Sequence, residues 1–169
     1  MSLTWRDVSA PLRTLARWVA IIQVVGYTTS LVFVWHTTHL VPSGVAARYR
    51  GVDPEAAPPG AALQFSKSFS EMLTITHTHL LSMAVIFTLT GVGIALCARL
   101  SDRWKRLLIA EPFGALLVSF SAMWLMRYVD GRFGWLLEAS SALLALTFYL
   151  QSYLILRELR QVEREEARV

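Results

Sequence analysis

The sequence predicts an all-α integral membrane protein that folds as one domain, an antiparallel bundle of four transmembrane helices over residues 1–169. The first observation is composition: 54% of the 169 residues are hydrophobic and only 17% are charged, against about 25% in soluble domains. The second is that four apolar segments reach the roughly 20 residues needed to cross the hydrocarbon core. These spans are roughly residues 15–36, 72–96, 107–126 and 133–155.

The connections between the spans differ in length. The first and second spans are joined by a long connection, roughly residues 40–68, whose prolines and glycines argue against one regular element. Within it, "PSGVAARYRG" predicts a short helix with Ser43 near its start and Gly51 at its end. The third and fourth spans are joined by a tight turn at Asp130-Gly131. The mixed-charge C-terminal tail is expected to continue the fourth span as a solvated helix.

Basic residues predict the orientation. Eleven of the 16 Lys and Arg residues lie in the N-terminal segment, between the second and third spans, or in the C-terminal tail. Because basic segments stay in the cytoplasm, we expect both termini inside and the long loop outside. The location expected is the inner (cytoplasmic) membrane of a bacterium, where the chain is a multi-pass protein in contact with the lipid bilayer. The net charge of +4 follows from this topology, so we expect no nucleic-acid partner.

All four histidines lie in two short stretches. His36 and His39 end the first span, and His77 and His79 lie near the start of the second. Counting about 20 residues back from the inner end of the second span reaches His77, and Trp35 marks the outer interface. We therefore expect all four at one depth near the outer boundary, with the first span packed against the second there. Histidine inside a membrane usually has a function; the alternative is an interfacial anchor.

Helical geometry separates the members of each pair. His77 and His79 are two residues, or about 200°, apart, so at most one faces the first span. We expect His77 to face a polar slot, because its side of the helix carries Ser70, Thr74, Thr78 and Leu81. If His79 is the inward residue, the site is lined by Thr76, Ser82 and Met83. His36 is the expected partner, because His39 lies close to the loop.

Electron transfer through one haem b is the first function that fits these residues. Haem iron takes two axial imidazoles from facing helices, and a four-helix bundle offers room for the macrocycle. The ligands would be one of His36 and His39 with one of His77 and His79. The propionates would pair with basic residues of the outer face: Arg127, Arg132, Arg48 and Arg50. Such a protein would exchange electrons with quinol or with a periplasmic carrier.

Two alternatives use the same residues differently. A directly bound zinc or copper ion would take ligands from His36, His39, His77, His79 and Glu138. Met72, Met123 and Met126 would favour copper, although each can equally be core filler. Alternatively, the chain is a metal-free accessory subunit of a respiratory or photosynthetic complex, with histidine and Glu138 near a quinone headgroup. Other membrane subunits would then be its partners.

Two further polar residues have simpler explanations. Glu111 precedes Pro112 on the inner side of the third span, where we expect it to pair with Arg103 or Arg106. The single cysteine, Cys97, excludes an internal disulfide. We expect it to be a packing residue at the inner end of the second span.

The segments "THTHLLSMAVIFTLTG", "EPFGALLVSFSAMWLMRY" and "FGWLLEASSALLALTFYLQ" resemble those of small bacterial four-span membrane proteins. The arrangement as a whole is similar to small membrane cytochromes b. This resemblance implies a helical bundle that holds haem b and transfers electrons. It departs from the usual two-haem pattern, because histidines occur at one membrane face only, so it implies one haem.

Overall fold

The computed structural model describes residues 3–52 and 64–168 of the chain. Within these residues it contains five α-helices: α1 (Ala10–Thr38), α2 (Pro42–Arg50), α3 (Phe69–Ala95), α4 (Asp102–Tyr128) and α5 (Phe133–Glu166). A 3₁₀ turn, η1 (Trp5–Asp7), precedes them, and the described part of the chain has no strand. Four of the helices, α1, α3, α4 and α5, are long and apolar enough to cross a membrane. The predicted four-helix membrane bundle is confirmed.

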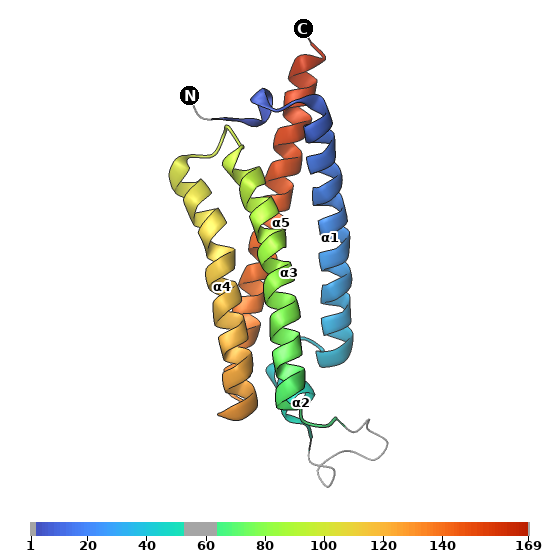
Figure 1. The fold of residues 1–169 in the computed structure, drawn as a ribbon, viewed down its shortest axis with the longest axis vertical. Helices are drawn as coiled ribbons and strands as arrows, with labels where there is room; N and C mark the ends of the chain where they lie inside the picture. Colours follow the sequence, from blue (N-terminus) through green and yellow to red (C-terminus); the bar gives the residue numbers. More distant parts are fainter. Residues whose placement is uncertain (1–2, 53–63, 169) are drawn as a thin grey trace.

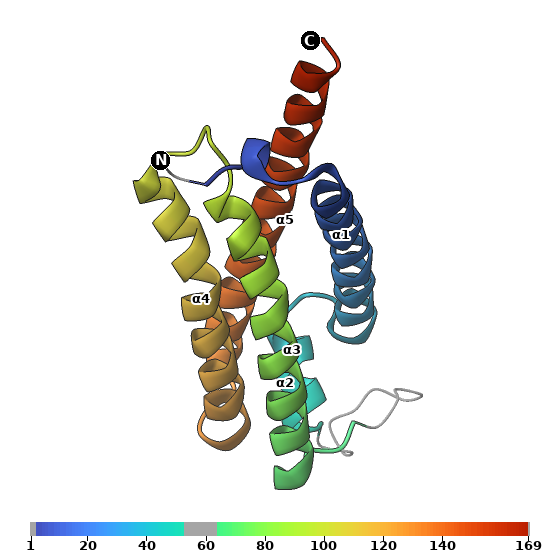
Figure 2. The same cartoon turned by 45° about the horizontal axis from the view of Figure 1, so that its top comes forward.

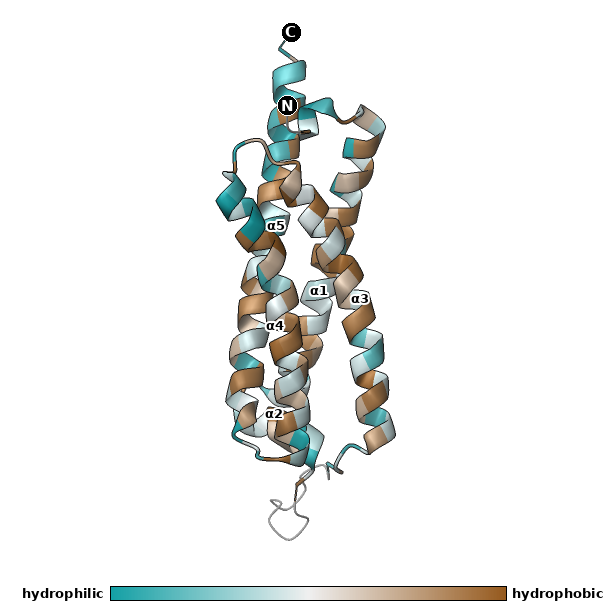
Figure 3. Cartoon of the chain, turned by 60° about the vertical axis from the view of Figure 1, so that its left-hand side comes forward, coloured by the Kyte–Doolittle hydropathy of each residue, from teal (hydrophilic) through white to brown (hydrophobic). Residues whose placement is uncertain are grey.

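The four long helices run antiparallel. Both termini lie at the end of the bundle that carries the α3–α4 connection, and α2 lies at the opposite end (Figures 1 and 2). α4 and α5 make the most extensive contact and α3 packs against both, whereas α1 contacts mainly α5 and α2. Apolar residues dominate the middle of the helices, and hydrophilic residues gather most densely at the C-terminal end of α5 (Figure 3). The predicted basic side therefore corresponds to one physical end of the bundle.

Two clusters of buried apolar residues are stacked along the bundle. The cluster in the middle contains Phe87, Ala115, Leu116, Leu144 and Phe148. The cluster nearer the termini contains Trp5, Ile94, Cys97, Leu108, Ile155, Leu159 and Val162. Gly93 lets α3 and α5 approach closely in this second cluster, because a Cβ at that position would lie only 2.5 Å from Ile155 Cδ1. Close helix packing at small residues is typical of membrane bundles.

The end of α5 continues as a helix to Glu166, as predicted, but solvent does not surround it. Leu159 and Val162 are buried, because η1 and the start of α1 pack on this side. Ion pairs join the two segments: Arg6–Glu165 at 2.7 Å, Arg13–Glu166 at 2.6 Å, and Arg17–Glu163. The prediction of a solvated tail is therefore corrected, since several of its glutamates bind the N-terminal segment.

The short helix predicted in the long connection is present as α2. It has Ser43 in its first turn and ends before Gly51, whose φ of 81° residues with a Cβ rarely adopt. Gly44 lets α2 approach α1, because a Cβ there would lie 2.1 Å from the Thr38 carbonyl oxygen. Residues 53–63 of the predicted loop lie outside the described residues. At the end of the bundle opposite the termini, α1 thus packs against α2, which corrects the prediction that the first span packs against the second there.

α1 is the least buried of the four long helices. Only 6% of its most apolar 18-residue window is buried, against 28% in α3 and 39% in α4 and in α5. It reaches the core at mid-height, where Val24 and Tyr27 pack against the middle cluster. A broad face of α1 is therefore left for lipid or for another protein.

Candidate functional site

The four histidines lie at the end of the bundle opposite the termini, as predicted. His36 is in the last turn of α1, and His39 ends that helix in the left-handed conformation, with φ 54°. His77 and His79 follow the start of α3 by about two turns. Figure 1 shows the end of α1 and the beginning of α3 at the same end of the bundle. All four side chains are exposed.

The structure does not turn His36 towards α3. On this half of α1, the residues Tyr27, Leu31, Val34 and Thr38 recur at intervals of three or four and are buried or half-buried. His36 is two residues from both Val34 and Thr38, or about 200° around the helix. His36 and His77 of one chain therefore do not face each other.

The helical phase expected for α3 is also wrong. Ser70, Thr74, Thr78 and Leu81, which were expected to line a polar slot beside His77, are all exposed. The inward side carries Thr76 and Met83, both half-buried, and Trp124 Nε1 on α4 donates to Thr76 Oγ1 at 2.9 Å. His79 uses its ring locally, since Nδ1 donates to the Ile75 carbonyl oxygen at 2.9 Å. His77 and His79 thus sit on the flanks of α3, outside the core.

The other proposed metal ligands do not join the histidines. Glu138 is half-buried on α5, and its Oε1 has no hydrogen-bond partner among the described residues. Met72, Met123 and Met126 are buried core residues, so none of them shares the exposed surface with the histidines. In the described part of the chain, no three residues of the types His, Cys, Asp and Glu form a group that could hold a metal ion.

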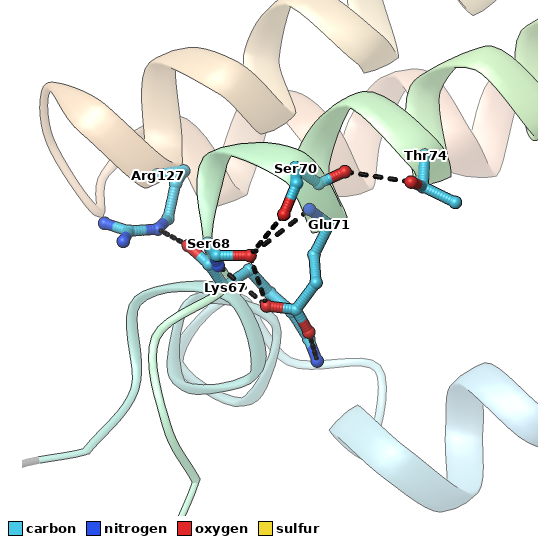
Figure 4. Close-up of polar contacts among 6 residues, drawn as sticks. All are labelled: Lys67, Ser68, Ser70, Glu71, Thr74 and Arg127. Carbon is cyan, nitrogen blue, oxygen red and sulfur yellow. Dashed lines mark hydrogen bonds and ion pairs between the residues drawn. The ribbon is translucent and has the colours of Figure 1, made fainter.

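The basic residues at this end of the bundle mainly form hydrogen bonds that hold neighbouring helices and connections together. Arg127 Nε donates to the Lys67 carbonyl oxygen at 2.8 Å, directly before α3 (Figure 4). Ser68 and Glu71 form a capping box there, in which Glu71 also binds Lys67 Nζ at 2.9 Å. Arg50 Nη1 donates to the Met126 carbonyl oxygen at 3.0 Å. Arg132, by contrast, is exposed, and its Nε lies 3.7 Å from Asp130 Oδ2. Among the arginines proposed to bind haem propionates, it is therefore the most accessible to a ligand.

A second polar group lies inside the bundle, and the sequence did not predict it. Pro112 has no N–H, so the Leu108 carbonyl oxygen loses its helical donor. The fully buried Gln151 of α5 replaces that donor, with Nε2 at 2.6 Å from the Leu108 oxygen. Both carboxylate oxygens of the neighbouring Glu111, and Gln151 Oε1, are buried without a partner among the described residues.

The expected ion pair of Glu111 with Arg103 or Arg106 is not formed. Glu111 instead lies on the side of α4 shared by Leu108 and Ala115, both buried. A Glu-Pro pair inside one apolar span and a glutamine inside another were the available signals. Only the fold shows that the glutamine donates to the carbonyl oxygen that the proline leaves without a donor.

Cys97 is buried at the end of α3, as expected. Burial, together with nearby Glu158, raises the pKa of its thiol to about 11. At pH 8 the folded protein therefore holds less of the reactive thiolate than an unfolded chain does. We expect iodoacetamide to label the folded protein at least about 100-fold more slowly than the SDS-unfolded protein, as followed by mass spectrometry. Equal labelling rates would contradict this burial.

A family model described as a transmembrane helical domain matches residues 39–166, which is more than half of the chain. The match begins after α1 and ends at the last residue of α5. No curated protein and no solved structure matches the chain. The chain therefore belongs to this family of transmembrane helical domains.

Proposed function

We propose that the chain is a subunit of a larger electron-transfer complex in the bacterial cytoplasmic membrane, with haem b bound by its outer histidines. The observation that supports this is the exposure of all four histidines at one end of a membrane bundle. Ionisable side chains within membranes almost always face protein or a functional cavity. A neighbouring subunit or a cofactor on this surface would give the imidazoles such a contact.

The residues restrict how haem b can fit. Haem b of this type needs an axial imidazole on each side of the iron, and His36 points away from His77 within one chain. One chain would therefore supply one ligand, and a neighbour would supply the second. We propose His77 as the chain's own ligand, because it lies inside α3, whereas His39 ends α1. His79 is the alternative ligand, since its Nδ1–H donates to the Ile75 carbonyl oxygen and leaves Nε2 to coordinate iron. Quinol or a periplasmic carrier would exchange the electrons.

The second candidate is an accessory subunit without a cofactor, and the outward direction of His36 favours it. In that case the exposed face of α1 contacts another membrane subunit, and the histidines form hydrogen bonds across the contact. A zinc or copper site has less support, because such a site needs three or four protein ligands, and the described residues of one chain gather no group of three.

The test is an optical spectrum and metal analysis of the protein purified in mild detergent, with its mass measured in the same detergent. We expect a Soret band that sharpens on reduction and a particle larger than one chain. His77→Ala should remove the band, whereas the matched variants His39→Ala and His79→Ala should lower it by less than about half. If His36→Ala also removes the band, the second ligand is His36 of another copy.

Other outcomes separate the alternatives. A colourless protein in a larger particle supports the cofactor-free subunit, and stoichiometric zinc or copper supports the direct metal site. A colourless, metal-free monomer that stays monomeric in native membranes overturns the proposal.

A further inference from the structure

Three arginines near the C-terminal end of α5 line a groove of about 310 Å³ on the exposed surface of the bundle, at the end that carries the termini. They are Arg157, Arg160 and Arg164, and Tyr153, Leu156 and Gln161 complete the lining. All three arginines are exposed, and none forms an ion pair with any described residue. Other arginines at this end do pair with glutamates of α5: Arg6, Arg13, Arg17 and Arg99. The groove therefore keeps uncompensated positive charge.

These arginines extend an exposed stripe along one face of α5. The stripe consists of Leu146, Leu150, Tyr153, Arg157, Arg160 and Arg164, at successive intervals of three or four residues, the spacing of a single helix face. Its apolar part is open, since Leu146 is 69% exposed and Tyr153 is 58% exposed. The stripe changes along the helix from aliphatic to aromatic to cationic. Acyl chain, interface and phosphate follow the same order in a phospholipid.

We propose that this stripe binds an anionic phospholipid whose headgroup carries two phosphodiester groups. Guanidinium groups bind phosphate oxygens through paired N–H donors. The arginines from Arg157 to Arg164 extend over roughly 10 Å of helix axis, which suits two phosphates better than one. The acyl chains lie along Leu146 and Leu150. Basic pockets at the cytoplasmic ends of transmembrane helices bind such lipids through this chemistry.

The test is a lipid titration of the full chain in detergent, followed by native mass spectrometry. Cardiolipin, with two phosphodiesters, is compared with phosphatidylglycerol, phosphatidylcholine and inorganic phosphate. The variant Arg157→Gln/Arg160→Gln is compared with Arg103→Gln/Arg106→Gln, which removes the same charge at the same end from exposed residues outside the groove. We expect the groove variant to bind cardiolipin about tenfold more weakly and the control to change less than about twofold.

Arg157→Lys/Arg160→Lys keeps the charge but loses the paired donors. Its affinity for cardiolipin should therefore lie between that of the wild type and that of the glutamine variant. Circular dichroism checks that every variant stays folded, and Arg160→Gln alone replaces a double variant that does not. An equal loss in the control overturns the site, because binding then reflects general charge. Phosphatidylglycerol binding as tightly as cardiolipin overturns the two-phosphate assignment. Displacement of the lipid by millimolar inorganic phosphate would show an ion site instead.

Discussion

Trp5→Ala is expected to destabilise the bundle by about 3 kcal/mol, in the range for removing a large buried aromatic side chain. Trp5 is only 5% exposed and belongs to the core cluster with Ile94 and Leu159. Its Nε1 donates to the Gly93 carbonyl oxygen at 3.1 Å, and its backbone N–H donates to the Leu96 carbonyl oxygen at 3.1 Å. The side chain thus fastens the N-terminal segment across the ends of α3 and α5.

The measurement is unfolding by SDS in mixed micelles, followed by circular dichroism. Trp18→Ala is the matched control, because Trp18 is 60% exposed on α1 and makes no core contact of this kind. The control should change the unfolding free energy by less than about 0.5 kcal/mol. Equal effects of the two substitutions would mean that the N-terminal segment does not dock on the bundle in solution.

Trp5 also shows where prediction from the sequence stops. The four spans could be predicted, because apolar length is a local property. The turn at Asp130-Gly131 could be predicted for the same reason. The docking of Trp5 could not, because its partner Gly93 is 88 residues away and its neighbours Thr4, Arg6 and Asp7 are polar. The charge pattern of the C-terminal tail looked solvated for the same reason, since its partners lie at the other end of the chain.

The candidate site could likewise be predicted only in part from the sequence. The location of all four histidines towards the end of the bundle opposite the termini could be predicted by counting residues along each span. Their directions could not, because α1 is apolar on nearly all sides and its sequence does not show which face is buried. For α3, Ser70, Thr74 and Thr78 on the side of His77 suggested a polar interior. These three residues are exposed, and Thr74 satisfies its hydroxyl by donating to the Ser70 carbonyl oxygen at 2.9 Å. Polar residues that bond to their own helix carry no information about the direction of the core.

Gln151→Leu is expected to destabilise the protein by about 1–2 kcal/mol, although leucine is apolar and similar in size. The reason is the carbonyl oxygen of Leu108, which Pro112 deprives of its helical donor. Gln151 Nε2 is the donor at 2.6 Å. Leucine leaves that oxygen buried without a partner, and a lone buried acceptor costs more than an ordinary hydrogen bond contributes.

Pro112→Ala provides the decisive comparison. Alanine restores an N–H that can reach the Leu108 carbonyl oxygen within α4, so the amide of Gln151 is no longer needed. In the Pro112→Ala background, Gln151→Leu should therefore cost less than about 0.5 kcal/mol, and it can even stabilise the protein because the unpartnered Oε1 is removed. The measurement is a double-mutant cycle by SDS unfolding, with an expected coupling of at least about 1 kcal/mol. Additive changes in the unfolding free energy would show that the Gln151 amide does not compensate for the N–H that Pro112 lacks. The burial of Gln151 would then have a cause other than the Leu108 carbonyl oxygen.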